Sequence, residues 1–140
     1  MDDETVSAEE FGASLRGLGV NIIVTDVLRT AKFLTQVFGI TGHRLGPDFA
    51  IVRYGDQVFQ LHSDGTFGGH PLHGLLPESP PRGTGIELRL YDTDPDNAAA
   101  KAETAGGMVL QPPTDKPHGL RECVILDADG YAWVPSRPLK

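Results

Sequence analysis

Apolar residues recur at every second position in two segments of the chain, and this alternation predicts two related β-strands. The first is LGVNIIVTD, beginning at Leu18, and the second is TGIELRLYD, beginning at Thr84. Aligned end to end, the segments match glycine with glycine (Gly19 and Gly85) and aspartate with aspartate. The chain is therefore predicted to contain an internal repeat.

A helical pattern follows each of these strands. VLRTAKFLTQVF carries an apolar stripe at helical spacing, with Asp26 as its expected N-cap and Gly39 at its end. PDNAAAKAETA follows Asp94, another expected N-cap, and begins with Pro95, which suits the first helical position. Both repeats thus begin with a strand and continue into a helix.

Three further strands are expected after each helix, so each repeat has the order βαβββ. The fold class is α+β: the two repeats pair into a curved mixed sheet that forms a cup, with the helices on its outer face. One domain covers residues 17–140, with repeat one at about 17–63, a loop at 64–83 and repeat two at about 84–136. The expected later strands are 42–45, 49–54, 57–62, 108–111, 121–126 and 131–134.

Two segments lie outside the repeats. Residues 1–16 are mostly polar and are expected to form a partly mobile extension. Their acidic start differs from the basic and then apolar start of a signal peptide, and no apolar run reaches the ~18–20 residues that cross a bilayer, so we expect a cytoplasmic protein without a membrane partner. The loop at 64–83, rich in Gly, Pro and His, is expected to cover a site, link the repeats or contact a partner.

Charge and cysteine content narrow the possible partners. The net charge is −7, whereas binding to nucleic-acid phosphates needs a basic surface, so a small molecule or a protein is the expected partner. The single cysteine, Cys123, allows no intrachain disulfide and no cysteine zinc site, and we expect it to be buried and inert.

The same alternation predicts which side chains line the cup. Val20, Ile22, Val24, Ile86, Leu88 and Leu90 should face the helices, and Val134 should line the cup while Trp133 points away. Glu87 and Arg89 could form a surface ion pair, or they could help to orient a ligand in a half-enclosed pocket. The polar residues expected in the cup are Asn21, Gln60, His62, Glu87 and Arg89.

The order of these segments resembles the vicinal oxygen chelate superfamily, which includes glyoxalase I, extradiol dioxygenases and bleomycin-resistance proteins. The resemblance rests on VTDVLRTAKFLTQVFGI, FAIVRYGDQVFQLH, KPHGLRECVILDADGYAWV and the repeat itself. The second and third segments are most similar to the bleomycin-resistance-like branch. That branch implies a homodimer and further ligand-binding positions at His118, Arg121 and Glu122, with His118 where an aromatic residue stacks on the ligand.

Glyoxalase-like enzymes hold a metal at four positions, which the resemblance assigns to Gly19, Gln60, Gly85 and Val134. Only Gln60 offers a side-chain donor, whereas a divalent metal needs about three or four protein ligands. We therefore expect no metal and no other cofactor. A displaced site made of His62 and Glu87, completed by Gln60 or a loop histidine, remains an alternative.

The resemblance implies a metal-free protein that binds a small organic ligand, such as an antibiotic or secondary metabolite, without transforming it. An enzyme is the main alternative, either a metal-dependent lyase, isomerase or dioxygenase with displaced ligands, or a metal-free catalyst. In the metal-free case His62 or Glu87 would act as the acid or base. A scaffold or regulatory dimer with an empty cup is a third possibility.

Overall fold

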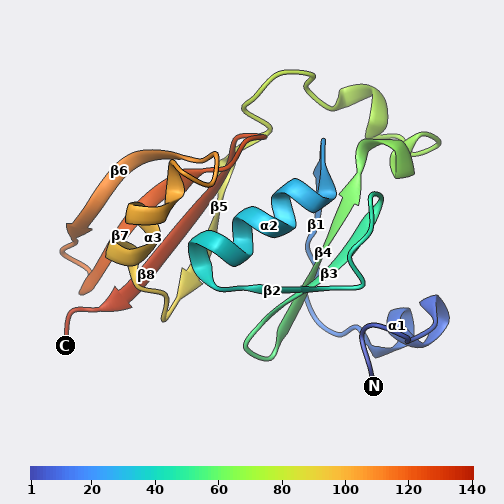
Figure 1. The fold of residues 1–140 in the computed structure, drawn as a ribbon, viewed down its shortest axis with the longest axis horizontal. Helices are drawn as coiled ribbons and strands as arrows, with labels where there is room; N and C mark the ends of the chain where they lie inside the picture. The colour runs from blue at the N-terminus through green and yellow to red at the C-terminus, as the bar shows by residue number, and fades with distance from the viewer. The chain divides into compact units, whose positions relative to one another are not determined.

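The computed structural model describes residues 1–140, which form two compact units (Figure 1). Met1–Ala31 and Ile40–Gly74 make the first unit, and Lys32–Gly39 and Leu75–Lys140 make the second. Two four-stranded mixed sheets and three α-helices confirm the α+β class. The joining of both repeats into one cup stays a prediction. None of the helices is long and apolar enough to cross a bilayer.

The first unit contains a mixed sheet with the strand order β1-β4-β3-β2, in which β1 and β4 are parallel. After β4 the chain makes two short 3-10 helices, at Asp64–Phe67 and His73–Leu75. The helices and strands that contribute to this unit are α1 (Ala8–Ser14), β1 (Asn21–Val24), the first part of α2 (Val27–Phe38), β2 (Thr41–His43), β3 (Phe49–Tyr54) and β4 (Gln57–Ser63).

The second unit repeats this topology with the strand order β5-β8-β7-β6, and β5 and β8 are its parallel pair. The internal repeat predicted from the sequence is therefore confirmed. The elements of this unit are the last part of α2, β5 (Gly83–Tyr91), α3 (Pro95–Ala102), β6 (Met108–Asp115), β7 (Leu120–Leu126) and β8 (Tyr131–Pro138).

The predicted N-caps of both repeat helices and the predicted end of α2 are confirmed, whereas α3 ends at Ala102, before the expected end at Ala105. Asp26 accepts a hydrogen bond from the Arg29 amide at 3.0 Å before α2, and Gly39 follows α2 with a φ of 71°. Asp94 caps α3 by accepting from the Asp96 amide at 3.0 Å, and Pro95 occupies the first turn. Each helix thus begins where a carboxylate binds an amide that has no partner within the helix.

Two strands are longer than expected. β6 continues through Pro112 and Pro113, which an edge strand tolerates because one row of its amides needs no partner in the sheet. β8 continues past Pro135 in the centre of its sheet, so Ser136 belongs to the strand. The expected ranges 108–111 and 131–134 are therefore too short, and the structure corrects them.

The expected orientation of Ile86 toward a helix is wrong. Its side chain is 56% exposed, whereas Leu90 on the same strand is buried. The pairing of β5 with β8 shifts register between Gly83 and Leu88, so the residues between them leave the regular alternation. Alternation predicts side-chain direction only where the ladder is regular.

The N-terminal segment is more ordered than its polarity suggests. Ser7 caps α1 by accepting from the Glu10 amide at 3.1 Å. Val6 and Phe11 are buried in one cluster with Ile51 of β3, and Leu15, Phe49 and Val58 pack against it. The expectation of a partly mobile extension at 1–16 is corrected, because two buried apolar side chains anchor the segment to the first sheet.

The turn between β7 and β8 is built around a buried carboxylate. Asp127 accepts hydrogen bonds from the amides of Asp129 and Tyr131, both at 3.0 Å, and from the Trp133 indole at 2.9 Å. Burial raises the pKa of the Asp127 carboxyl, and the Trp133 hydrogen bond acts in the opposite direction. Trp133 also packs against Phe38 of α2, with ring centroids 6.0 Å apart.

Candidate functional site

Polar side chains meet aromatic rings on one face of the first sheet. Register pairs Asn21 and Ile51 with Gln60, and Phe49 with His62, so these side chains share one side. We call this surface the first-sheet face. It brings together three predicted site residues, of which Asn21 is exposed and Gln60 and His62 are half-buried.

Gln60 and His62 form the polar pair of the first-sheet face. The His62 Nε2 lies 2.9 Å from the Gln60 Oε1, so the imidazole N–H donates to the amide oxygen. Phe49 and Phe67 contact the His62 ring edge-on, with centroids 5.2 and 5.7 Å away. Burial lowers the pKa of His62, and the imidazole is therefore neutral at pH 7.

A hollow of about 270 Å³ lies beside Gln60 in the first unit. Gly19 is part of its wall, and a Cβ added to Gly19 would meet no atom within 4 Å. The remaining wall comes from the segment before β1 and from β4. The hollow is lined by Leu15, Arg16, Gly17, Leu18, Gly19, Val20, Val58, Phe59 and Gln60.

The second sheet carries an ionic network centred on Glu122. Arg89 donates to the Glu122 carboxylate at 2.8 Å and to the more exposed Glu87 at 3.1 Å. His118 donates from Nε2 to the same Glu122 oxygen at 2.8 Å. Four predicted site residues therefore meet in the second unit, and Arg89 connects the two carboxylates.

Opposing effects set the charge of Glu122, which is only 5% exposed. Burial raises the pKa of its carboxyl, but the hydrogen bonds from Arg89 and His118 outweigh burial and bring the pKa below its usual value. Glu122 is therefore ionised at pH 7, and its charge is neutralised by Arg89. A buried ion pair of this kind is rigid enough to orient a polar group beside it.

Arg121 does not join this network. It neighbours Glu122 on β7, and successive strand residues point to opposite faces. Its guanidinium binds Asp96 of α3 at 2.9 Å and Asp115 of β6 at 2.8 Å. The structure thus separates Arg121 from the other predicted site residues of this unit.

Two further residues lie beside the network, and one of them, Ser136, was missed by sequence reasoning. Ser136 lies opposite Glu122 in the β7–β8 register and beside Tyr91 in the β5–β8 register. Its hydroxyl is buried and has no hydrogen-bond partner. Tyr91 packs its ring against the Arg89 guanidinium, 5.5 Å from the centroid. Continuing the period-two alternation beyond Pro135 would have found Ser136. Glu87, Arg89, Tyr91, Glu122, Val134 and Ser136 define the second-sheet face.

Cys123 lies on the opposite side of β7 and takes no part in this network. Its side chain is fully buried, and its thiol lies 3.5 Å from the Pro95 carbonyl. Burial raises the pKa of the thiol to about 11. The thiol is therefore protonated at neutral pH and is a poor nucleophile.

The sequence profile of the glyoxalase/bleomycin resistance protein/dioxygenase superfamily matches residues 18–134, most of the chain. The protein belongs to this superfamily. A search of curated proteins found no match. The match covers both repeats but stops before Ser136, and it excludes α1.

Solved structures of this superfamily share the fold. An enzyme of the glyoxalase/bleomycin resistance protein/dioxygenase family from Burkholderia phytofirmans PsJN has a TM-score of 0.73 and 19% identity, covering 86% of this chain and 97% of its own. A glyoxalase-related enzyme from Fulvimarina pelagi has a TM-score of 0.69 and 17% identity, with 87% of each chain covered. TioX from Micromonospora sp. ML1 has a TM-score of 0.62 and 23% identity, covering 89% of this chain and 99% of its own.

The superfamily's metal positions do not carry a ligand set in this member. Gly19, Gly85 and Val134 have no donor atom in their side chains, and Gln60 offers an amide. A Cβ at Gly85, as at Gly19, would meet nothing within 4 Å. No group of three His, Cys, Asp or Glu side chains is arranged to hold a metal ion. The residues present therefore do not fit the metal centre of the glyoxalases.

Proposed function

We propose that this superfamily member is a metal-free cytoplasmic protein that binds a small organic molecule, such as an antibiotic or secondary metabolite, without transforming it. We also propose that it acts as a homodimer and does not bind nucleic acid, in line with its net charge of −7. The sites proposed for the ligand are the first-sheet face and the second-sheet face.

One observation carries the proposal. Gly19 and Gln60, two positions where the superfamily places metal ligands, both line the hollow of about 270 Å³. A glycine with no atom within 4 Å of its missing Cβ leaves space where a metal-binding side chain would stand. Space of this kind suits part of an organic ligand, with nearby polar groups to fix its orientation.

The second-sheet face supports the same function. Arg89, Glu122 and His118 form a preorganised hydrogen-bonded set, and the buried Ser136 hydroxyl has no partner in the protein. A buried polar group without a partner costs free energy unless a ligand or water satisfies it. A ligand with a hydroxyl, amide or carboxylate would satisfy the Ser136 hydroxyl.

The test combines metal analysis with ligand binding. Protein purified without chelator is expected to contain no stoichiometric Fe, Mn, Ni or Zn, and a thermal-shift screen of metabolites and metal-free bleomycin should yield a stabilising ligand. Gly19→Leu should fill the hollow and remove that stabilisation. Gly69→Leu is the matched control, because Gly69 also has no atom within 4 Å of a Cβ but lies outside the hollow.

One tightly held metal per chain would contradict the proposal and favour a metal-dependent enzyme with displaced ligands. No stabilisation by any compound would favour a scaffold or regulatory dimer with an empty cup. A strict monomer in size-exclusion chromatography with light scattering would contradict the proposed homodimer. Ligand binding that is equally strong in Gly19→Leu would show that the ligand binds outside the hollow.

A metal-free acid–base enzyme is the second candidate, and the state of His62 favours it. A neutral, half-buried imidazole held by Gln60 can accept a proton from a bound molecule. Glu87 is less suited to this role, since it is exposed and its carboxylate is already bonded to Arg89. Turnover of a screened compound that is lost in His62→Gln but kept in Glu87→Gln would identify His62 as the base.

A further inference from the structure

The N-terminal segment is tied to the first sheet by polar contacts as well as by its apolar cluster. Asp3 accepts from the Arg53 guanidinium on β3, with Oδ1 and Nη2 2.8 Å apart. Glu4 accepts from the Arg44 amide at 3.0 Å, and its other oxygen lies 3.1 Å from His43. Arg44 also donates from its guanidinium to the Val6 carbonyl. These contacts fix the residues that precede α1.

This docking leaves a half-open cavity of about 390 Å³ between α1 and the first-sheet face. Its volume lies in the range of small-molecule sites, roughly 300–1,000 Å³. Apolar side chains make most of the wall, and Arg44 and Gln60 supply its charged and amide groups. The lining residues are Val6, Ser7, Ala8, Phe11, Gly12, Leu15, Arg44, Phe49, Ile51 and Gln60.

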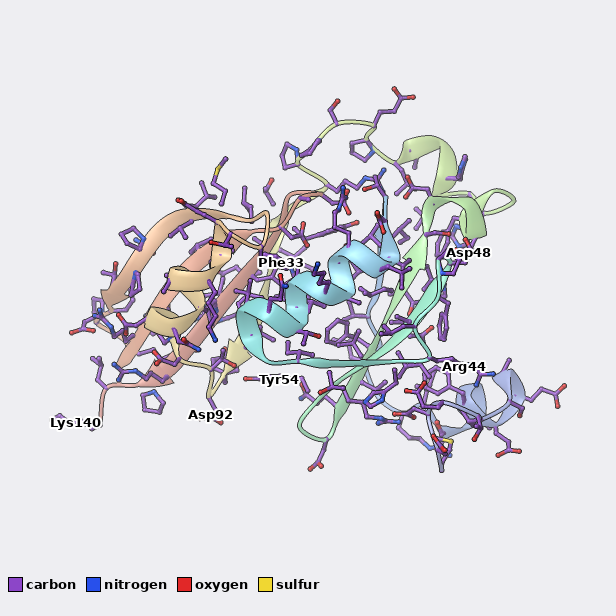
Figure 2. All side chains as sticks on the ribbon, viewed as in Figure 1. Phe33, Arg44, Asp48, Tyr54, Asp92 and Lys140 are labelled. Atoms are coloured by element: carbon purple, nitrogen blue, oxygen red, sulfur yellow. The ribbon has the colours of Figure 1, made fainter.

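The polar groups of the cavity are hydrogen-bond donors. Arg44, which Figure 2 labels, donates from its guanidinium to the Val6 backbone carbonyl. This partner is not a carboxylate, so no ion pair neutralises the positive charge of Arg44. The Gln60 oxygen is already bonded to His62, which leaves the Gln60 NH₂ group to donate. Donors of this kind in an apolar wall recognise an anionic acceptor, and a carboxylate matches a guanidinium best.

We propose that this cavity binds a small monocarboxylate with an aromatic or branched apolar body. The carboxylate pairs with Arg44 and accepts from the Gln60 amide, and the body packs against the apolar wall that includes Phe11 and Ile51. The α1 helix, which lies outside the matched superfamily region, is one wall of the site. The inference rests on the proposed binding function and adds the ligand class and the N-terminal wall.

The first experiment tests the charge. Isothermal titration calorimetry with 2-naphthoate and its neutral analogue 2-naphthamide is expected to show that the carboxylate binds about tenfold more tightly or better, because hydrogen bonds to charged groups are strong. Arg44→Gln should remove this preference. Lys101→Gln on α3 makes the same change in net charge at a residue that does not line the cavity, and it should keep the preference.

The second experiment tests the space. Gly12 lies in α1 and lines the cavity, and a Cβ added there meets no atom within 4 Å. Gly12→Leu should therefore fill the cavity and abolish naphthoate binding. Gly12→Ala should leave binding within about threefold of the natural protein. Both variants should fold, since each replaces a helical glycine by a better helix former.

The outcomes separate this inference from the proposed function. Failure of the natural protein to bind 2-naphthoate below millimolar concentration, equal binding of the amide, or full binding by Gly12→Leu would each overturn the inference. The proposed function would survive these results if another metal-free ligand bound and Gly19→Leu weakened it. A stoichiometric metal would overturn the proposed function, while a naphthoate site lost in Gly12→Leu would still support the N-terminal cavity.

Discussion

The two repeats share a strand order but present opposite chemistry on corresponding sheet faces. The first-sheet face combines aromatic rings with the uncharged Gln60–His62 pair, and α1 packs against it through Phe11. The second-sheet face carries the buried pair of Arg89 and Glu122. Topology is set by apolar positions that recur in both repeats, whereas face chemistry depends on the residues between them and on segments outside the repeat.

The hairpin turns differ in the same way. Asp56 in the β3–β4 turn is exposed. Asp127 in the β7–β8 turn is buried and accepts three hydrogen bonds, one of them from Trp133. Equivalent turns therefore stabilise the two repeats to different degrees, and substitutions can measure that difference.

The largest expected effect on stability comes from removing the apolar contact between α1 and the first sheet. Phe11→Ala should lower the free energy of unfolding by about 3 kcal/mol, because it removes a buried ring that contacts Phe49. Urea denaturation followed by circular dichroism measures the change. Leu18→Ala is the control and should change stability by less than about 0.5 kcal/mol, since Leu18 is 94% exposed. Equal effects would show that α1 does not cover the sheet in solution.

A smaller loss is expected from the turn of the second repeat. Asp127→Ala should cost about 2 kcal/mol because it leaves the Trp133 indole and two amides without their acceptor. Asp56→Ala, the matched change in the first repeat, should cost less than about 0.5 kcal/mol. Trp133 is the only tryptophan, so its fluorescence reports the environment of this turn directly. A similar cost in both turns would contradict the comparison.

The sequence predicted what depends on local periodicity. Both helix caps, the repeat and the placement of Gln60 beside His62 follow from spacing alone. The docking of α1 does not, because Val6 and Phe11 are isolated among polar residues and their partner Ile51 is distant in the chain. The cavity exists only after this docking, so no local pattern could predict it.

Only part of the second-sheet face was predicted from the sequence. Alternation identified Glu87 and Arg89, and the resemblance added His118 and Glu122. Ser136 was not predicted because it follows Pro135, and proline usually ends or interrupts a central strand. Arg121 was grouped with Glu122 by position in the motif, but neighbouring residues on a strand point to opposite faces.

The ionic network of the second-sheet face should contribute less than the turn. Arg89→Met is expected to cost about 1–2 kcal/mol, because it leaves the buried Glu122 carboxylate without its guanidinium partner. Arg121→Met, which removes a more exposed ion network on the other face, should cost less than Arg89→Met. Urea denaturation at pH 7 measures both, and a double variant Arg89→Met/Glu122→Gln should recover part of the loss.

The smallest expected effects concern the pH dependence of stability, which should differ between the first-sheet face and the second-sheet face. Burial lowers the pKa of His62 in the folded protein, so the imidazole binds a proton more readily in the unfolded chain. The stability contributed by neutral His62 is therefore present above pH 6.5 and is lost as the pH falls toward the folded-state pKa. Arg89 and His118 outweigh burial and lower the pKa of Glu122, so its contribution is present above pH 4.5 and is lost only as the pH falls below that value. His62→Phe should therefore flatten the stability profile just below pH 6.5, and Glu122→Gln should flatten it below pH 4.5. Unfolding free energies measured from pH 7.5 to 3.5 test both windows, and a slope below pH 6.5 that persists in His62→Phe would assign it to other groups.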